Sequence, residues 1–208
     1  MTLLLSTARR AGEGERLVRA DKWQGWHPTQ MLGHHVTGKR VGVVGMGRIG
    51  QAIARRCHFG FGMQVAYQSR SAKQLDFEAE FIPDLSALAA SVDFLVLAVP
   101  GGAETRHLID APVLEAMNPS AILVNIARGE VVDEAALISA LQAGQIAGAG
   151  LDVYEFEPVV PQALREMQNV TLLPHLGTAT EEVRTGMGHM ALDNVAAFVV
   201  GRDLPNPV

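Results

Sequence analysis

Two almost uninterrupted apolar runs constrain the fold of this chain more than any other feature. They are DFLVLAV at residues 93–99 and AILVNIA at residues 121–127. A strand with one face in water alternates apolar and polar residues, whereas these runs do not, so both faces of each strand must be covered. Such strands occur in parallel sheets that carry helices on both faces, and the runs therefore predict an α/β fold.

Shorter apolar or β-branched runs alternate with helical patterns from residue 39 onward, which predicts a doubly wound parallel sheet of about seven strands. The predicted strands cover residues 39–45, 63–68, 79–82, 93–99, 120–126, 146–151 and 170–173. The predicted helices cover residues 48–60, 84–91, 111–117, 133–143, 161–167 and about 179–200. Asp133 and Gly144 are suitable N-cap and C-cap residues for the fourth of these helices.

The chain divides into four predicted segments. Residues 1–18 hold a separate helix at 2–18, residues 19–38 form a linker arm, residues 39–178 form the sheet domain, and residues 179–208 hold a closing helix and tail. An arm of about 20 residues without periodicity is long for a compact domain. We therefore expect the arm to be functional or to wrap on a partner.

Charge and composition exclude several classes of partner. The net charge is −5, without a basic stripe, which disfavours nucleic acid and anionic membranes and leaves a small-molecule ligand as the expectation. The opening MTLLLSTARR is too short for a membrane span and lacks a signal-type cleavage region. The single cysteine, Cys57, cannot form an internal disulfide and is expected to be a buried apolar residue, which favours a cytoplasmic protein. The histidines lack metal-ligand spacing, so we expect no metal.

A glycine-rich turn after the first strand predicts dinucleotide binding. VGVVGMGRIG places Gly45, Gly47 and Gly50 at Gly-x-Gly-x-x-Gly spacing between a strand and a helix. The first glycine allows a tight turn, the second lets the backbone approach a pyrophosphate, and the third lets helix and strand pack closely. The sheet domain is then of the Rossmann type. The alternative is a glycine-rich turn that serves only packing.

The end of the second strand predicts which cofactor is preferred. A carboxylate that binds the adenine ribose of NAD is expected about 20 residues beyond the glycines. Ser69, Arg70 and Ser71 occupy this place instead, and two hydroxyls with a guanidinium suit a 2′-phosphate. NADP(H) is therefore favoured over NAD(H). The alternative is that Arg70 is a solvated surface charge stacked on adenine.

Three later blocks place chemically active side chains after strand ends. LVNIARGEVVD contains Arg128, GAGLDVYEFEP contains Asp152 and Glu157, and LLPHLGTAT contains His175. Together with the glycine motif and the run VDEAALISALQAGQIAGAGLDV, these blocks resemble the D-isomer-specific 2-hydroxyacid dehydrogenases over nearly the whole chain. The resemblance implies an NAD(P)-dependent oxidoreductase acting on a small 2-keto or 2-hydroxy acid.

The resemblance implies that Arg128 binds the substrate carboxylate and carbonyl, that His175 is the acid/base, and that Glu157 orients the histidine. These roles suit the chemistry, because a guanidinium offers a planar fork of donors and imidazolium can donate a proton near neutral pH. His175 could instead be a buried histidine that satisfies strand-end carbonyls. Arg128 could pair with Glu130 or Asp133, and the rival carboxylate Glu155 is expected to be a solvated loop charge.

The resemblance also implies a set of cofactor contacts, with Asp152 at the nicotinamide amide and with Pro100 and Thr105 in the cofactor trough. This chain departs from the family at Gly101-Gly102, where a bulky residue and a hydroxyl are more usual. The complete predicted set is Gly45, Met46, Gly47, Arg48, Ile49, Gly50, Ser69, Arg70, Ser71, Val99, Pro100, Thr105, Ile126, Ala127, Asp152 and Gly177.

The arm WQGWHPTQMLGHHVTGK resembles the glyoxylate/hydroxypyruvate reductase branch, which implies that Trp26 reaches the active site of a neighbouring subunit. We therefore expect a homodimer and favour glyoxylate or hydroxypyruvate as substrate. An alternative is that Trp23 or Trp26 anchors the arm in its own core.

Family members begin with most of a separate substrate domain, and this chain starts inside the helix that follows it. The N-terminal and closing helices are therefore expected to be a remnant and a return helix of that domain. We expect NADPH binding with impaired turnover, because domain closure excludes water and aligns the reactants. The alternative is a non-catalytic dinucleotide-binding module with cofactor-dependent partners.

Overall fold

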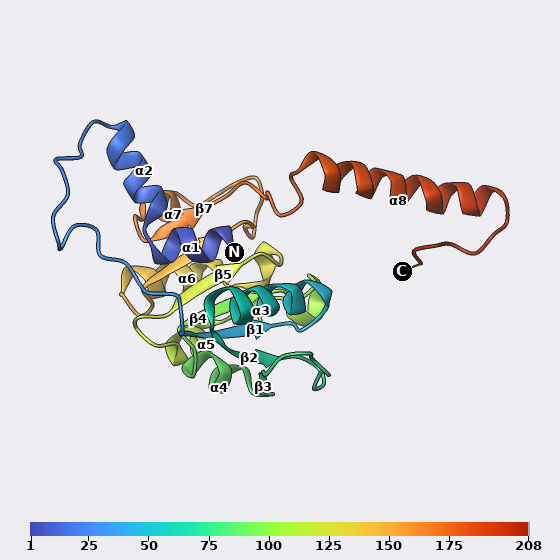
Figure 1. Ribbon diagram of the computed structural model, residues 1–208, viewed down its shortest axis with the longest axis horizontal. Coiled ribbons are helices and arrows are strands. Elements are labelled where there is room, and N and C mark those ends of the chain that lie inside the picture. Colours follow the sequence, from blue (N-terminus) through green and yellow to red (C-terminus); the bar gives the residue numbers. More distant parts are fainter. Residues whose placement is uncertain (208) are drawn as a thin grey trace. The chain divides into compact units, whose positions relative to one another are not determined.

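The computed structural model describes residues 1–207 as two compact units, Met1–Leu173 and Pro174–Val208, in which Val208 itself is left out (Figure 1). The first unit holds the parallel sheet, and the second holds one long helix and a tail. The predicted division at residues 18, 38 and 178 into functional segments stays a prediction.

The first unit is built on a parallel sheet with the order β3-β2-β1-β4-β5-β6-β7. The chain runs outward from β1 to β3 and then returns to place β4 beside β1, which makes a topological switch point between β1 and β4. All residues of β4 and β5 are buried, which confirms the two-sided coverage predicted from the apolar runs. The strands are Arg40–Val44 (β1), Gln64–Gln68 (β2), Glu80–Phe81 (β3), Phe94–Leu97 (β4), Ile122–Asn125 (β5), Gly148–Leu151 (β6) and Val170–Leu172 (β7).

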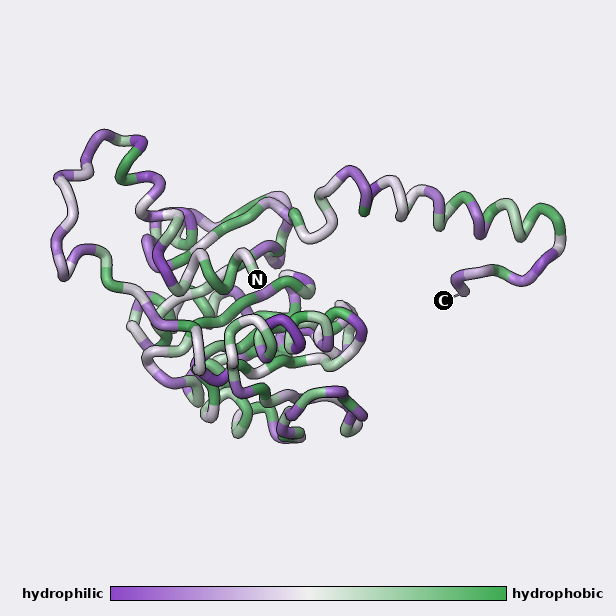
Figure 2. The backbone as a smooth tube through the Cα atoms, in the orientation of Figure 1, coloured by the Kyte–Doolittle hydropathy of each residue, from purple (hydrophilic) through white to green (hydrophobic). Residues whose placement is uncertain are grey.

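Helices cover this sheet, and two apolar clusters form the core of the unit. One cluster includes Leu95, Leu114 and Leu137, and the other includes Phe94 and Cys57. Figure 2 shows that apolar residues concentrate in the helices and strands, while the arm is largely polar. The helices from the first glycine turn onward are Arg48–Phe61 (α3), Leu85–Ala90 (α4), Ala111–Ala116 (α5), Glu134–Gln142 (α6) and Gln162–Glu166 (α7), with 3₁₀ turns at Ala103–Thr105 (η1) and Gly129–Val131 (η2).

The prediction of a single, separate helix at residues 2–18 is wrong. The segment forms Thr2–Ala8 (α1) and Ala11–Arg19 (α2), and Arg10 adopts a left-handed conformation with φ 52° between them. Leu3 and Leu4 of α1 are buried in the core, and a β-carbon at Gly150 of β6 would lie only 3.0 Å from that of Leu3. No residue of α2 is buried. The break therefore lets the apolar first helix pack on the sheet while the polar second helix stays exposed.

Two local predictions, the ends of α6 and the burial of Cys57, are confirmed. The Asp133 side chain accepts a hydrogen bond from the Ala136 amide at 3.0 Å at the start of α6, and Gly144 follows its end with φ 67°. Cys57 is fully buried, and this burial raises the pKa of its thiol to about 11. Within residues 1–207, no helix has the length and apolar character needed to cross a membrane.

The second unit consists of a turn, the helix Glu181–Val199 (α8) and the tail. The Thr180 side chain caps the helix by accepting a hydrogen bond from the Val183 amide at 3.3 Å. Arg184 donates from Nε to the Thr178 carbonyl oxygen at 3.1 Å, which further fixes the first turn. The predicted closing helix is thus confirmed to within two residues at its start.

Candidate active site

The predicted cofactor residues of the first unit all follow the carboxyl ends of strands. Because the strands are parallel, these ends lie along one edge of the sheet. The residues come after β1 (Gly45, Met46, Gly47, Arg48, Ile49 and Gly50), β2 (Ser69, Arg70 and Ser71), β4 (Val99, Pro100 and Thr105), β5 (Ile126 and Ala127) and β6 (Asp152).

The glycine turn leaves a space at the start of α3. Gly45 has φ 95°, and a β-carbon there would lie 2.7 Å from the Ala98 carbonyl oxygen. A β-carbon at Gly50 would lie 1.9 Å from the Gly45 carbonyl oxygen, so both glycines are required by packing. At Gly47 a β-carbon would meet nothing within 4 Å. The packing alternative thus explains Gly45 and Gly50. The open space at Gly47 fits the approach of a phosphate to the helix N-terminus.

The segment after β2 lies beside this turn. The Gly45 amide donates to the Gln68 carbonyl oxygen at 2.9 Å, so Ser69–Ser71 begin directly next to the glycine turn. Ser69 Oγ donates to the Ser71 carbonyl oxygen at 2.6 Å, which closes a tight turn. Arg70 is exposed, and its guanidinium forms no hydrogen bond or ion pair within residues 1–207.

Arg128 is held in place through its backbone. Asn125, which is 1% exposed at the end of β5, accepts from the Ala127 amide and donates to the Arg128 carbonyl oxygen, both at 3.0 Å. Arg128 is exposed and donates from Nη1 to the Ala127 carbonyl oxygen at 2.6 Å. Arg128 forms no ion pair with Glu130 or Asp133, and those carboxylates accept backbone hydrogen bonds from Gly102 and Ala136.

The loops after β4, β5 and β6 meet at glycines. A β-carbon at Gly101 would lie 2.7 Å from Cγ of Arg128, so the loop after β4 packs against the arginine stem. A β-carbon at Gly129 would lie 1.8 Å from the carbonyl carbon of Tyr154, so the loops after β5 and β6 are in backbone contact. This chain differs from the family at Gly101 and Gly102, and both glycines have a structural reason. A side chain at 101 would overlap the Arg128 stem, and Gly102 has φ 129°.

Glu157 and Glu155 lie on the loop after β6 and differ in environment. Glu157 is exposed and accepts from the Tyr154 amide at 3.1 Å. The expectation that Glu155 is a solvated loop charge is wrong, because its side chain is 8% exposed. It lies 3.0 Å from Nη2 of Arg106 and 2.8 Å from Nε2 of His107, which come from the loop after β4.

The sequence reasoning missed Asn125, His107 and Glu134 as groups that organise these loops. His107 also donates its amide to the Glu130 carbonyl oxygen at 2.7 Å, so it contacts the loops after both β5 and β6. Burial raises the pKa of Glu134, whose Oε2 accepts from the Glu155 amide at 3.4 Å. The one signal in the sequence was Asn125, an amide inside an otherwise apolar run.

A hydrogen bond of Tyr154 joins the loop after β6 to the end of β7. We expect this hydrogen bond to affect the pH dependence of the free energy of unfolding. The Tyr154 hydroxyl donates to the Leu173 carbonyl oxygen at 2.9 Å. Burial, followed by the nearby Asp152 charge, raises the pKa of the phenol from 10.0 to about 12. The unfolded chain therefore releases this proton at lower pH than the folded chain, and the free energy of unfolding falls as pH rises through that window.

Tyr154→Phe should remove this contribution, so the variant should lose less stability than the wild type between about pH 10 and pH 12. Below pH 9 the variant should be less stable by about 1 kcal/mol, because a buried hydrogen bond is lost. Urea unfolding at several pH values measures both effects. Parallel curves for the two proteins across the alkaline range would contradict the assignment.

His175 and Gly177 belong to the second unit, in the segment that precedes α8, where His175 has φ 55°. The meeting of His175 with Arg128 and Glu157 stays a prediction.

Trp26 lies in the arm of the first unit and is 80% exposed, so the alternative that it anchors the arm in its own core is wrong. Trp23 is 55% exposed.

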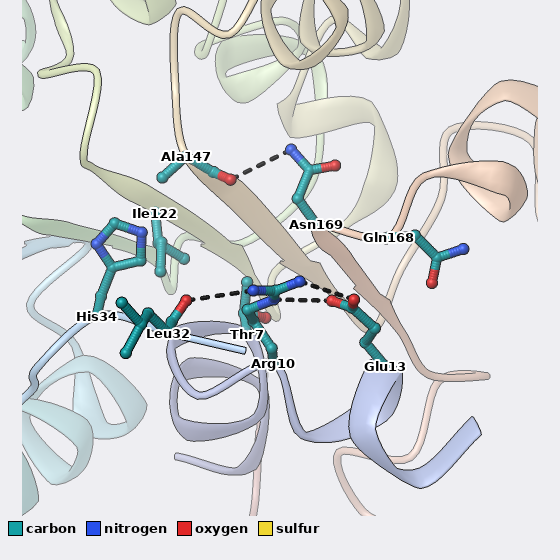
Figure 3. A pocket seen from close by; sticks show the side chains of 9 residues that line it. All are labelled: Thr7, Arg10, Glu13, Leu32, His34, Ile122, Ala147, Gln168 and Asn169. Carbon is teal, nitrogen blue, oxygen red and sulfur yellow. Dashed lines mark hydrogen bonds and ion pairs between the residues drawn. The ribbon is translucent and has the colours of Figure 1, made fainter. Parts of the chain in front are cut away.

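A pocket in the first unit lies at the opposite edge of the sheet (Figure 3). Ile122 opens β5, while Ala147 and Asn169 immediately precede β6 and β7, so the pocket faces the amino ends of the strands. Its arginine is already paired, because Arg10 contacts Glu13 at 2.7 and 2.8 Å. This pocket shares no residue with the loops around Arg128.

Comparison with known proteins gives a consistent set of relatives. Residues 1–177 match the model of the family described as "D-isomer specific 2-hydroxyacid dehydrogenase, NAD binding domain". The chain is 50% identical to a glyoxylate reductase of Thermococcus gammatolerans, over all of this chain and 64% of that protein. It is 47% identical to glyoxylate/hydroxypyruvate reductase B of Serratia proteamaculans, over 97% of this chain and 63% of that protein.

Solved structures agree with these sequence relatives. The NADPH-dependent glyoxylate/hydroxypyruvate reductase of Sinorhizobium meliloti, in complex with NADP and malonate, is 42% identical with a TM-score of 0.93, over 99% of this chain and 64% of that one. The apo form of Rhodotorula graminis D-mandelate dehydrogenase is 34% identical with a TM-score of 0.88, over 99% of this chain and 62% of that one. The chain thus spans somewhat less than two thirds of the length of these relatives.

Proposed function

Because the chain belongs to the D-isomer-specific 2-hydroxyacid dehydrogenase family, we propose that it serves hydride transfer between NADP(H) and glyoxylate or hydroxypyruvate. The observation that carries this proposal is the convergence of the loops after β4, β5 and β6 on Arg128, at the sheet edge that also holds the glycine turn. In open α/β sheets, ligands bind at this edge and at the switch point between strands.

The residues at the switch point fit a nicotinamide dinucleotide. Gly47 leaves room for a pyrophosphate, and the first amides of α3 can donate to it. Ser69, Arg70 and Ser71 support the preference for NADP(H), because they bring a guanidinium and hydroxyls without a carboxylate. The related Sinorhizobium meliloti protein, which is described as NADPH-dependent, supports the same preference.

The proposed mechanism divides the reduction of a 2-keto acid among three side chains. The cofactor, when bound, supplies the hydride that forms the new C–H bond. Arg128 holds the substrate carboxylate and polarises the carbonyl with its planar fork of donors. His175 donates a proton to the carbonyl oxygen, so that the C=O group becomes CH–OH. The family resemblance assigns Glu157 the role of orienting the histidine, and a carboxylate in that role favours the protonated imidazole.

A spectrophotometric assay tests the proposed activity. We expect loss of NADPH absorbance with glyoxylate and hydroxypyruvate, with low turnover by these 208 residues and higher turnover by a form extended upstream. Binding of NADPH without turnover in either form, with every 2-keto acid tried, would contradict the oxidoreductase and favour a non-catalytic dinucleotide-binding module.

Cofactor titration tests the preference for NADP(H). Arg70→Gln should weaken NADPH binding by about tenfold or more, because a charge-assisted contact to the 2′-phosphate is lost, while NADH binding should change little. Nucleotide fluorescence measures both dissociation constants. Tighter binding of NADH than of NADPH by the unmodified chain would contradict the preference.

We also propose that the chain forms a homodimer through its arm. Trp23 and Trp26 are large aromatic side chains held at the surface, and aromatic residues are enriched at protein interfaces. Light scattering measures the mass in solution. A monomer at concentrations of about 100 μM, well above an ordinary dimer dissociation constant, would contradict this proposal.

A further inference from the structure

We propose that Lys73 provides a second cation for the 2′-phosphate of the cofactor, next to Arg70. This inference rests on the proposed preference for NADP(H) and names a further residue that determines it. The predicted set of cofactor contacts includes Ser69, Arg70 and Ser71 but not Lys73, whose side chain the folded turn brings back toward Ser71.

The first observation is the contact between Lys73 and Ser71. Lys73 Nζ donates to Ser71 Oγ at 3.2 Å, and Ser69 Oγ donates to the Ser71 carbonyl oxygen at 2.6 Å. Because the Ser71 hydroxyl accepts from the ammonium group, its own proton remains available to donate to a phosphate oxygen. The turn thus places an ammonium group beside the hydroxyl that is predicted to meet the 2′-phosphate.

The second observation is that a buried phenol fixes this turn. Tyr67, on β2, is 2% exposed, and its ring lies 5.4 Å from that of Phe81. The Lys73 amide donates to Tyr67 Oη at 2.8 Å. Residues 69–73 therefore form a loop that leaves the strand and is bonded back to it. The Lys73 backbone is therefore held near the end of β2, so the loop has less backbone freedom to lose on binding.

The third observation is the charge balance of this segment. SRSAKQL, at residues 69–75, contains Arg70 and Lys73 and no acidic residue. The next acids are Asp76, which is paired with Arg55 of α3, Glu78, which is exposed and forms no ion pair with Arg70 or Lys73, and Glu80, which is paired with Arg40 of β1. Asp76 and Glu80 are therefore engaged by other cations, and none of the three carboxylates is paired with Arg70 or Lys73.

The charge of the ligand explains why two cations fit better than one. A phosphate monoester carries about −1.5 to −2 charges near pH 7, so one guanidinium leaves much of that charge uncompensated. Arginine binds in a planar, bidentate way, and lysine adds a compact point charge that does not compete for the same geometry. NADH has a neutral 2′-hydroxyl and would gain little from the second cation.

Cofactor titration of lysine variants tests the inference. Lys73→Gln should weaken NADPH binding by about tenfold and change NADH binding by less than about twofold, whereas Lys73→Arg should stay within about threefold for both. Lys22→Gln, in the exposed arm, is the matched control and should change neither. Competition by 2′,5′-ADP should weaken in Lys73→Gln, and competition by 5′-AMP should not. Thermal unfolding checks that the substitutions at Lys73, which is exposed, leave the fold unchanged.

Two outcomes separate this inference from the proposed function. If Lys73→Gln weakens NADPH and NADH equally, or weakens neither, the role of Lys73 is overturned, while a wild-type preference for NADPH that Arg70→Gln abolishes would still support the cofactor proposal. If the wild type binds NADH more tightly than NADPH, the cofactor preference itself fails, and the role of Lys73 fails with it.

Discussion

Gly129→Ala should destabilise the first unit by about 3 kcal/mol or more, because the added methyl group overlaps backbone atoms. The new β-carbon would lie 1.8 Å from the carbonyl carbon and 1.9 Å from the carbonyl oxygen of Tyr154, and 2.4 Å from the Glu155 amide nitrogen. No side-chain rotation can relieve this overlap, so the loops after β5 and β6 must separate. Urea denaturation at neutral pH measures the free energy of unfolding.

A matched glycine gives the control for this experiment. Gly60 lies near the exposed end of α3, and a β-carbon there would meet nothing within 4 Å. Gly60→Ala should therefore leave stability unchanged or raise it by up to about 1 kcal/mol, since alanine restricts the unfolded chain and favours helix. Equal unfolding midpoints for Gly129→Ala and the wild type would show that the two loops are not in the close contact described.

Gly129→Ala should also affect turnover more than cofactor binding. Gly129 immediately follows Arg128, and Tyr154 donates its amide to the Glu157 carboxylate at 3.1 Å. The glycine contact therefore joins the loop of the predicted substrate-binding residue to the loop of the predicted orienting residue. The glycine turn after β1 lies outside this contact, although Ala127 and Asp152 lie on the two loops, so NADPH affinity should fall by a smaller factor than turnover in protein that remains folded.

The strands could be predicted from the sequence because their signal is local. A run such as DFLVLAV has only one way to hide both faces, and the structure buries all of β4. Asp133 and Gly144 likewise mark the ends of α6 through hydrogen bonds and backbone angles within a few residues. The glycine turn was readable for the same reason, since its spacing reports the local path of the backbone.

The errors arose where tertiary contacts override the local pattern. The break at Arg10 follows from packing α1 on the sheet, and the helical pattern of residues 2–18 does not contain that contact. Glu155 looked solvated because Arg106 and His107, which cover it, are about 48 residues away in sequence. Lys73 was missed because a bond to the buried Tyr67 hydroxyl turns the chain back toward Ser71.

Arg128→Gln and His175→Gln should cause the largest losses of activity in whichever form of the protein turns over glyoxylate. Arg128 has the only proposed contact with both the carboxylate and the carbonyl, and removing such a donor set should lower kcat/KM by about 10³-fold or more. His175→Gln should lower kcat by about 10²- to 10⁴-fold, because glutamine cannot supply the proton. Arg165→Gln, on the exposed side of α7, is the matched control and should leave kcat/KM unchanged.

The pattern of kinetic constants separates the two roles. Arg128→Gln should raise KM as well as lower kcat, because the arginine is proposed to bind the ground-state carboxylate, whereas His175→Gln should act mainly on kcat. Reduction by the wild type should slow as pH rises, because the donor must be protonated, and His175→Gln should lose this dependence. NADPH dissociation constants should stay within about twofold in both variants, which excludes loss of the fold as the cause. If Arg128→Gln keeps more than about a tenth of kcat/KM, the loops that meet at Gly101 and Gly129 hold some other catalytic group, and the proposed mechanism is wrong.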